Sequence, residues 1–386
     1  MDVSGALVRE VFEELVRAPS ENPPGDERAV AAVVRAWLEQ DGFEVREVAL
    51  DPRRPNVIGT LRRGLGRRLI LQGHADTKPA RTDGTLDLWS FNPYDVTEQD
   101  GRLYGLGACD TKGGLAAQLA AARLLVGHGD WSGELVVQAV ADEEDGSELG
   151  AQLLLEEGEL VGDSAVVAEP TSCYPSHAQL GNAWAEVMVC GVGAHAGRPQ
   201  LGIDAFEAAE RYLAVLRGLV AEQPHDPVFP GHPRVNVGDL LAPGHPGTVA
   251  GQCRLRCDIR VLPGQERDAV LGLYEEAAER LRGPGLHVEV TRYQGGGCQS
   301  HQIGLDAPVL LALHEAGGTG REPTRGAFFG GTDARFFAQA GTPAVVYGPG
   351  HLDQAHAPDE YVEIGQLEDA VRTLTAASRA YLSSWR

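Results

Sequence analysis

Arg68-Leu-Ile-Leu-Gln-Gly-His-Ala-Asp76 is a short apolar run that ends in a histidine and an aspartate. It predicts a strand over Arg68–Gln72 that delivers His74 at its carboxyl-terminal end. Two further runs end in a similar way: the strand predicted over Glu134–Ala141 leads into adjacent acids, and the one predicted over Ala165–Ala168 leads into Glu169. The recurring pattern is therefore a strand followed by side chains that carry charge.

Segments with helical spacing of apolar residues alternate with these strands. Helices are predicted over Leu7–Val16, Ala29–Leu38 and Leu115–Leu125, and further strands over Phe43–Val48, Val57–Leu61 and Thr342–Tyr347. Such alternation predicts an α/β fold with a mostly parallel sheet, in which sites collect beyond the carboxyl ends of the strands. We therefore expect the dispersed acidic and histidine segments to converge.

The middle of the chain has a different order of predicted elements. The order is βαββαβ, with strands over Ala183–Cys190, Arg234–Leu240, Gln252–Leu262 and Leu286–Tyr293, and helices over Ile203–Glu222 and Gln265–Arg282. This order is that of a ferredoxin-like unit, which can close its own core over a four-stranded sheet. We predict an inserted domain over residues 179–294, and a discontinuous α/β domain over 1–178 plus 295–386.

Composition and charge exclude several classes of protein. The chain has 386 residues, 43% of them hydrophobic, and a formal charge of −22. That charge disfavours binding to nucleic acid or to an anionic membrane surface. No apolar stretch reaches the ~20 residues of a membrane span, and the first ten residues do not have the pattern of a secretory signal. We expect a cytoplasmic protein.

The cysteines indicate neither a disulfide framework nor a thiolate metal site. All six are irregularly spaced, and no two form a Cys-x-x-Cys pair. We therefore expect reduced thiols.

Two histidines and three carboxylates make up the candidate metal ligands: His74, Asp110, Glu144, Glu169 and His356. Nitrogen and oxygen donors of this kind suit zinc and tolerate cobalt or manganese. Two metals in such sites lie only ~3.5–4 Å apart, so one carboxylate has to bridge them. The set predicts two metal ions per subunit and water-dependent cleavage of an amide-like bond.

Some of these segments also have a simpler explanation than metal binding. His74 and Asp76 are two residues apart at a strand end, where the Asp76 carboxylate could orient the ring that binds metal, but such pairs often form ordinary hydrogen bonds. Asp110 lies in a glycine-lined turn before a helix, where an aspartate commonly serves as the N-cap. A phosphate-binding loop is excluded there, because the glycine spacing does not match.

Glu143 and Glu144 are adjacent, so one could face a metal while the other faces the reacting water. The four acids of residues 142–145 could instead form a solvated surface. Four acids at the end of an apolar strand would repel one another unless a cation were present. We predict that Glu143 is the general base, which takes a proton from water and returns it to the leaving amine.

These segments together resemble the zinc-dependent aminoacylase and carboxypeptidase family. The resemblance rests on Gly73-His-Ala-Asp76, Leu103-Tyr-Gly-Leu-Gly-Ala-Cys-Asp-Thr-Lys-Gly-Gly114, Asp142-Glu-Glu144, Glu169-Pro-Thr171, and Tyr347-Gly-Pro-Gly350 through Ala355-His-Ala-Pro-Asp-Glu-Tyr361. It covers essentially the whole chain. The family includes acetylornithine deacetylase, succinyl-diaminopimelate desuccinylase and glutamate-releasing carboxypeptidases, and the segments around Asp110 and His356 are most similar to the acetylornithine deacetylase branch.

The resemblance implies which residue binds which metal. One zinc would be held by His74, Asp110 and Glu169, and the other by His356, Asp110 and Glu144, so that Asp110 bridges. Glu143 matches the catalytic carboxylate of the family. The peptide bond after such an aspartate is typically cis in the family, which implies a cis bond between Asp110 and Thr111. Many members carry Met where this chain has Thr111, a side chain that is not a ligand.

The resemblance also implies roles for the inserted domain as a lid. His195, in Gly193-Ala-His-Ala-Gly-Arg-Pro199, is similar to a lid histidine that stabilises the oxyanion in a neighbouring active site, often across a dimer. Asn236 and Arg260 match positions that bind the substrate carboxylate, and Gly330-Gly331-Thr332 resembles a substrate loop whose amides hold an anion. His195 could also be an ordinary loop residue, and Arg260 a surface residue. We expect a homodimer formed through the lid.

The expected function is removal of an acyl group, acetyl or similar, from an N-acylated amino acid or related amine, by a metal-dependent hydrolase acting on linear amide bonds. A desuccinylase-like deacylase, a dipeptidase and a carboxypeptidase are alternatives, because the metal centre does not depend on what flanks the amide. A non-catalytic binding module is a remote alternative, because such a module is expected to lose a ligand or the base, and all six matching residues are present.

Overall fold

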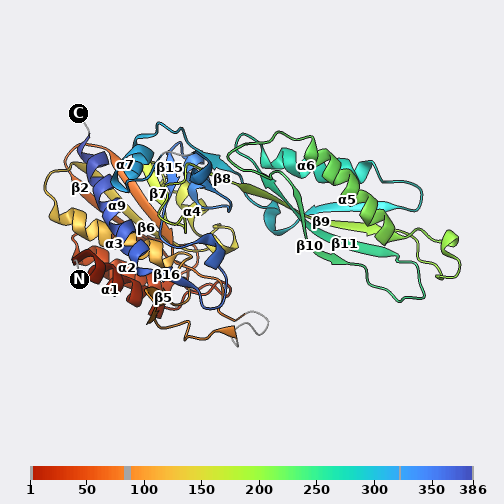
Figure 1. Ribbon diagram of the computed structural model, residues 1–386, viewed down its shortest axis with the longest axis horizontal. Coiled ribbons are helices and arrows are strands. Elements are labelled where there is room, and N and C mark those ends of the chain that lie inside the picture. The colour runs from red at the N-terminus through yellow and green to blue at the C-terminus, as the bar shows by residue number, and fades with distance from the viewer. Residues whose placement is uncertain (1–2, 82–87, 321–322, 385–386) are drawn as a thin grey trace. The chain divides into compact units, whose positions relative to one another are not determined.

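A computed structural model describes residues 3–81, 88–320 and 323–384, which form two compact units (Figure 1). The first unit comprises the chain up to Ala178, Ile303–Phe328 and the residues from Thr332 onward. The second comprises Gln179–Gln302 and Phe329–Gly331. The predicted fold class is confirmed: the first unit contains a mostly parallel sheet, and the second has the βαββαβ order.

A six-stranded sheet forms the centre of the first unit, in the order β1-β2-β6-β3-β7-β15. Its strands are β1 (Glu44–Val48), β2 (Asn56–Arg63), β3 (Arg68–His74), β6 (Gly133–Val140), β7 (Ser164–Val167) and β15 (Ala344–Val346). The four strands β6, β3, β7 and β15 are mutually parallel, whereas β2 pairs antiparallel with both β1 and β6. The carboxyl ends of the four parallel strands therefore lie along one edge.

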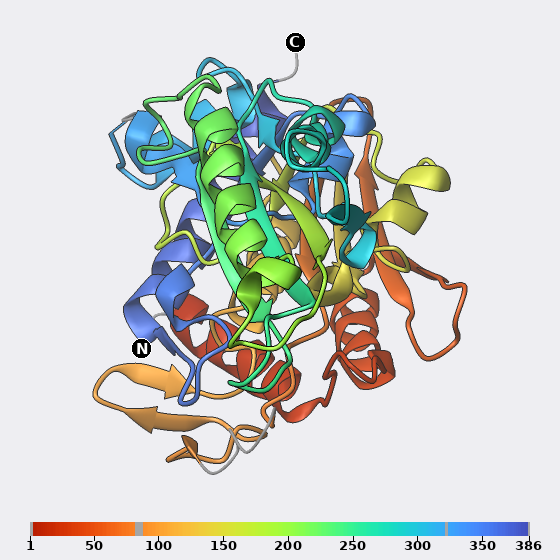
Figure 2. The same cartoon turned by 90° about the vertical axis from the view of Figure 1, so that its right-hand side faces the viewer.

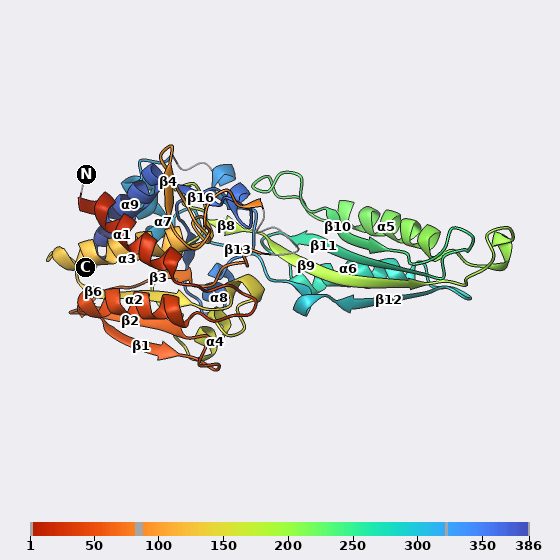
Figure 3. The same cartoon turned by 90° about the horizontal axis from the view of Figure 1, so that it is seen from below.

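Helices cover both faces of this sheet. The larger apolar core joins one face to α1 (Val3–Arg17), α2 (Arg28–Gln40), α3 (Lys112–Gly127), α7 (Pro308–Ala316) and α9 (Ile364–Ser383). A smaller core joins the other face to α4 (Ala151–Glu156) and α8 (Ala334–Gln339). Successive side chains of β3 point to opposite faces of the sheet. Leu69 and Leu71 accordingly belong to the larger core and Ile70 to the smaller. Figure 3 shows α1, α3 and α9 side by side.

Helix α3 begins at Lys112, three residues before the predicted start at Leu115. Two glycines follow in its first turn, and both lie in close contact with neighbouring backbone or side chains. A Cβ on Gly113 would lie 2.4 Å from the Ala108 carbonyl oxygen, and one on Gly114 would lie 2.8 Å from the Ala168 Cβ. The absence of side chains therefore lets α3 begin directly against the preceding loop and the end of β7.

The first unit also contains a small antiparallel sheet. It has the order β16-β5-β4, with β4 (Thr97–Gln99), β5 (Arg102–Tyr104) and β16 (Tyr361–Glu363). The pairing of Tyr361 with Tyr104 brings the residues before β16 next to the residues after β5. As a result, the segment that carries His356 lies beside the segment that carries Asp110.

The second unit is a four-stranded antiparallel sheet in the order β10-β11-β9-β12. Its elements are β9 (Gly181–Cys190), α5 (Ala205–Ala221), β10 (Val235–Leu241), β11 (Gln252–Val261), α6 (Arg267–Glu279) and β12 (His287–Arg292). Apolar residues alternate along β9 and β11 and pack against α5 and α6 in a core of their own; Figure 2 shows α5 lying along this sheet. The unit therefore has the means to fold around its own core.

The remaining elements are short. They are the strands β8 (Ala178–Gln179), β13 (His301–Gln302) and β14 (Ala327–Phe328), and 3₁₀ turns at Glu143–Asp145, Pro199–Leu201, Gln294–Gly296, Pro323–Gly326 and Leu352–Gln354. Within the ranges that the structure describes, no helix has the length and apolar character needed to cross a membrane.

The larger core should dominate the stability of the first unit. Leu71, with 0% exposure in β3, belongs to it, so Leu71→Ala should lower the free energy of unfolding by about 2–5 kcal/mol through lost packing and a residual cavity. Urea unfolding followed by circular dichroism measures this. Leu65→Ala is the matched control, because Leu65 is 90% exposed and its loss should change the free energy by less than about 0.5 kcal/mol. Equal effects of the two substitutions would contradict the assignment of the core.

Candidate metal centre

Three of the predicted site residues meet at the carboxyl ends of adjacent parallel strands. His74 is the last residue of β3 and pairs with Val140 at the end of β6, while Gln72 pairs with Val167 at the end of β7. Glu143 and Glu169 follow these neighbouring strands within three residues. One ligand atom of each of His74, Glu143 and Glu169 lies within 4.8 Å of those of the other two.

A second group consists of Asp110, Glu144 and His356, whose ligand atoms also lie within 4.8 Å of one another. The Asp110 carboxylate lies between the two groups. Its Oδ1 atom is 2.9 Å from Nε2 of His74, and its Oδ2 atom is 3.3 Å from Nε2 of His356. Because its two oxygens face histidines of different groups, Asp110 has the geometry of a bridging ligand.

The His74 ring is oriented by backbone. Its Nδ1 donates to the Asp76 carbonyl oxygen over 2.9 Å, which leaves Nε2 as the acceptor atom that can bind a metal. The carboxylate of Asp76 is more distant, at 3.5 Å from Nδ1. The sequence predicts that this carboxylate orients the ring. The nearer partner in the structure is the carbonyl oxygen of the same residue.

The Asp76 carboxylate instead holds the turn that follows β6. It accepts the backbone N–H groups of Glu143 and Glu144, at 3.1 and 3.2 Å, and the Asn22 side-chain amide at 2.9 Å. Burial raises the pKa of Asp76, which is 0% exposed, but the hydrogen bond and charge of His74, with the contacts to Asn22 and Glu144, outweigh this effect and lower it. Asp76 therefore ties the end of β3 to the pair of adjacent glutamates.

Asp142, the residue before Glu143 and Glu144, belongs to a buried network of ion pairs. Asp142 has a φ of 68° and accepts the Leu149 N–H at 3.0 Å. Its carboxylate is 2.8 Å from the guanidinium of Arg54, which also contacts Glu27 at 2.6 Å. The four acids of residues 142–145 are thus not a solvated face, because only Asp145 is exposed.

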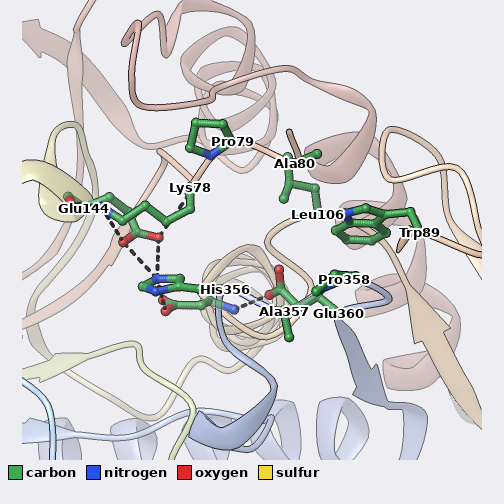
Figure 4. A pocket seen from close by; sticks show the side chains of 11 residues that line it. Lys78, Pro79, Ala80, Trp89, Leu106, Glu144, His356, Ala357, Pro358 and Glu360 are labelled. Atoms are coloured by element: carbon green, nitrogen blue, oxygen red, sulfur yellow. Dashed lines mark hydrogen bonds and ion pairs between the residues drawn. The ribbon is translucent and has the colours of Figure 1, made fainter. Parts of the chain in front are cut away.

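Glu144 is held from a second direction by Lys78. The Lys78 N–H donates to Oε1 of Glu144 over 3.2 Å, its ammonium donates to the Glu144 carbonyl, and the ammonium is 3.5 Å from Oε2. Both residues line a pocket beside the site, which Figure 4 shows together with His356 and Trp89. The second ligand group, Asp110, Glu144 and His356, thus lines this pocket.

The two histidines carry the charge that balances the central carboxylate. Burial raises the pKa of Asp110, but hydrogen bonds to His356 and His74 outweigh this effect and lower it. The same contacts act on the rings: hydrogen bonds to Asp110 and Glu144 raise the pKa of His356 to about 10. Burial lowers the pKa of His74, yet its bonds to Asp110 and Asp76 raise it overall.

The remaining carboxylates are held close together in a buried site. Burial, with the nearby charges of Asp333 and Glu144, raises the pKa of Glu143 to about 8. Burial and the charges of Asp110 and Glu143 raise the pKa of Glu169. Binding of a proton or of a divalent cation reduces the repulsion between these carboxylates. The nitrogen and oxygen donors therefore fit divalent metals of the zinc type.

The turn at Asp110 does not serve as a helix cap. The N-cap of α3 is Thr111, which makes no side-chain capping hydrogen bond, and the Asp110 carboxylate faces the two histidines instead. The bond between Asp110 and Thr111 is cis, as the family resemblance implied. The simpler explanation of Asp110 as an N-cap is therefore wrong.

The other predicted residues belong mostly to the second unit. His195 is exposed, and its Nδ1 accepts the Gly197 N–H at 3.0 Å. Asn236 is exposed on β10, while Arg260 on β11 pairs with Asp258 at 2.9 Å. Gly330 and Gly331 also lie in this unit, whereas Thr332 is buried in the first. Their roles stay predictions.

Sequence reasoning missed several residues that hold the site: Asn22, Arg54, Lys78 and Glu360. Glu360 is buried, and its carboxylate accepts backbone N–H groups of the Asp110 segment. Burial and the charge of Asp110 raise the pKa of Glu360 to about 8, against the effect of these N–H groups. A signal was available only for Glu360, because it lies within the quoted His356 segment.

Comparisons with known proteins agree with this site. The family described as Peptidase family M20/M25/M40 matches residues 70–380. Acetylornithine deacetylase of Vibrio vulnificus (strain CMCP6) is 31% identical over 379 residues, which cover 94% of each chain. Acetylornithine deacetylase of Pectobacterium carotovorum subsp. carotovorum (strain PC1) is 33% identical over 345 residues, covering 86% of this chain and 85% of that one.

Solved structures share the fold at lower identity. Aminopeptidase PepT of Bacillus cereus ATCC 10987 has a TM-score of 0.76 and 20% identity, with 97% of each chain covered. The YXEP protein of Bacillus subtilis, described as a dinuclear metal binding peptidase, has a TM-score of 0.69 and 17% identity, with 99% of each chain covered. Fold, ligand groups and relatives define a metal-dependent hydrolase of amide bonds. The chain belongs to peptidase family M20/M25/M40.

Metal uptake should release protons and strengthen as pH rises. Below a raised pKa the ring keeps a proton that a metal has to displace, and the pKa of His356 is about 10. Between pH 6.5 and 8.5, affinity for Zn²⁺ or Co²⁺ should therefore increase about tenfold per pH unit for each proton displaced.

Isothermal titration in two buffers of different ionisation enthalpy counts these protons. His356→Ala should release fewer protons than the parent, whereas His245→Ala, which alters an exposed histidine of the second unit, should match it. A pH-independent affinity without proton release would refute the proposed protonation state.

Proposed function

We propose that this protein is a two-zinc amidohydrolase that removes an acyl group, acetyl or similar, from an N-acylated amino acid or related amine. The observation that carries the proposal is the Asp110 carboxylate, which faces His74 with one oxygen and His356 with the other. The acetylornithine deacetylases at about 30% identity over most of the chain support the acyl substrate class.

His74, Asp110 and Glu169 would hold one zinc, and His356, Asp110 and Glu144 the other. Co²⁺ or Mn²⁺ could replace zinc, because the donors are nitrogen and carboxylate oxygen. Glu143 also offers an atom to the group of His74 and Glu169, so a ligand role competes with its proposed role as the base. Its neighbour Glu144 is nearer to His356, at 3.0 Å, which favours Glu144 as the ligand.

Bound metals would supply Lewis acidity, which makes water a stronger nucleophile near neutral pH and polarises an acyl carbonyl. Glu143 is suited to the proton transfers. Its backbone is fixed by Asp76, and its carboxylate lies beside the ligand atoms of His74 and Glu169, within reach of a water molecule at the metals. Glu143 takes the proton from the attacking water and returns it to the departing amine.

Several parts of the proposal come from the sequence alone: the residue roles from the family resemblance, and the domain bounds, location and partners from element order, charge and hydropathy. His195 would stabilise the oxyanion, Asn236 and Arg260 would bind the substrate carboxylate, and the amides of Gly330–Thr332 would hold an anionic group. Residues 179–294 would act as a lid and form a homodimer, and residues 1–178 plus 295–386 would form the catalytic domain. A cytoplasmic location, with neither nucleic acid nor membrane as partner, completes the proposal.

Alternative substrates keep the same chemistry. A succinyl-diaminopimelate desuccinylase-like deacylase, a dipeptidase or a carboxypeptidase would each use the same ligand groups, because the metals act on the amide and not on its flanks. The non-catalytic alternative is not supported, since the ligand groups are assembled and the relatives of the chain are hydrolases.

Release of free amine from a panel of acylated substrates tests the function. The zinc-loaded protein is incubated with N-acetyl, N-succinyl and N-formyl amino acids, N-acetylornithine among them, and with dipeptides. We expect release from N-acetyl substrates that a chelator abolishes and added zinc restores. Release from N-succinyl substrates or dipeptides alone would replace the acetyl assignment, and absence of release from all of them would overturn the proposal.

Glu143→Gln separates the base from a ligand. The substitution keeps size and removes the proton acceptor, so turnover should fall about 10²- to 10⁴-fold while two metals per chain remain bound. Turnover and metal content measured on the same preparation check this. Glu148→Gln, at an exposed position of the same segment, is the matched control and should retain both. Loss of one metal from Glu143→Gln would identify Glu143 as a ligand.

A further inference from the structure

We propose that Glu360 is a positioning residue that holds the ligand loop, defined as Gly105–Asp110, in the conformation that binds metal. The inference rests on the proposed two-metal site and assigns to it a residue that no ligand set includes. Glu360 would act through Asp110 and would not itself touch metal or substrate.

Four hydrogen bonds join Glu360 to the ligand loop. Its backbone carbonyl accepts the Gly105 N–H at 3.0 Å. Its carboxylate accepts three more: Oε2 takes the Gly107 N–H at 3.0 Å, and Oε1 takes those of Cys109 at 2.7 Å and Asp110 at 2.9 Å. One residue therefore receives four of the six N–H groups of the loop, including that of the bridging aspartate.

These N–H groups have no access to water as a substitute partner. Glu360 is 3% exposed, and both Cys109 and Asp110 are buried. The nearby Lys112 ammonium does not compete for Glu360, because it donates to the Ala18 carbonyl oxygen at 2.8 Å. The side chain is thus dedicated to backbone donors, and removing an acceptor leaves buried N–H groups unpaired.

The position of Glu360 in the chain links two ligands. It lies four residues after His356 and directly before β16, whose Tyr361 pairs with Tyr104 at the end of β5. His356 itself has a φ of 60°, in the left-handed region, so its backbone depends on the surrounding segment for support. One short segment thereby carries one ligand of the second group and holds the backbone of another, Asp110. Their separation is set by Glu360.

A purely structural role makes a different prediction. If Glu360 only stabilised the fold, its substitution would lower the melting temperature of the metal-free protein and leave the metal affinity of the folded protein unchanged. If it positions Asp110, affinity for metal falls in protein that is still folded. Residues that orient metal ligands typically change affinity or activity by about 10- to 100-fold when substituted.

The test is metal binding by Glu360→Gln, measured by competition with a chromophoric chelator and by the visible absorption of the Co²⁺-loaded protein. Gln has nearly the same size, but its amide group offers one acceptor oxygen where the carboxylate offers two, so at least one N–H loses its partner. We expect affinity to fall about 10- to 100-fold, with an altered Co²⁺ spectrum. Glu360→Asp keeps both oxygens but draws them back from the loop by one methylene group, so affinity should still fall, by less than in Glu360→Gln.

Asp359→Asn is the matched control. Asp359 precedes Glu360, but its carboxylate accepts the N–H groups of Ser90 and Phe91 at 2.7 and 3.3 Å, not those of the ligand loop. Its φ of 56° is one that Asn tolerates. Metal affinity of Asp359→Asn should stay within about twofold of the parent, a change too small to count against the 10- to 100-fold loss expected at Glu360.

The outcomes separate this inference from the proposed function. Parent protein that binds two metals, with Glu360→Gln binding them equally well, would overturn the positioning role and leave the function standing. Equal loss in Asp359→Asn would also overturn it, because the effect would belong to the segment as a whole. Parent protein that binds no metal would overturn both. If Glu360→Gln does not fold, the affinity of Glu360→Asp decides, and parent-like affinity would refute the role.

Discussion

A buried concentration of negative charge is the constraint on which the site depends. Asp110, Glu143, Glu144 and Glu169 are brought within a few ångströms of two histidines at the edge of a parallel sheet. Buried carboxylates repel one another and are unfavourable away from water. The same crowding that disfavours this arrangement without cations gives it a strong preference for divalent metals, so cation binding and the integrity of the site are coupled.

The fold meets this constraint by fixing backbone as well as side chains. Asp76 accepts the N–H groups of the glutamate pair, and Glu360 accepts those of the loop that carries Asp110. In both cases a buried carboxylate takes backbone donors and so determines where another carboxylate points. The ligands can then be placed closely in spite of their repulsion, because their positions are set by hydrogen bonds that lie outside the ligand groups.

Much of the candidate site could be predicted because its chemistry is local. His74 and Glu169 come directly after apolar runs, and strands of one direction end at one edge of a sheet. Most residues that hold the site in place could not be predicted in this way. Asn22, Arg54 and Glu360 lie 54, 88 and 250 residues from the groups they contact. Only Glu360 lies within a segment that the resemblance covers, and nothing in the sequence around Asn22 or Arg54 distinguishes them from surface residues. The sequence also did not show that the carbonyl oxygen of Asp76, more than its carboxylate, orients the His74 ring.

The sequence by itself determined the class of fold, the order of elements in each unit and the residues able to bind metal, because apolar periodicity and residue chemistry are properties of short segments. Only the tertiary structure decided how these residues combine. It divided them into two ligand groups, placed Asp110 between them, and gave Glu360 the backbone donors of the ligand loop. The physical reason is that these contacts join residues brought together by strand order and helix packing, and no local pattern encodes the distances between them.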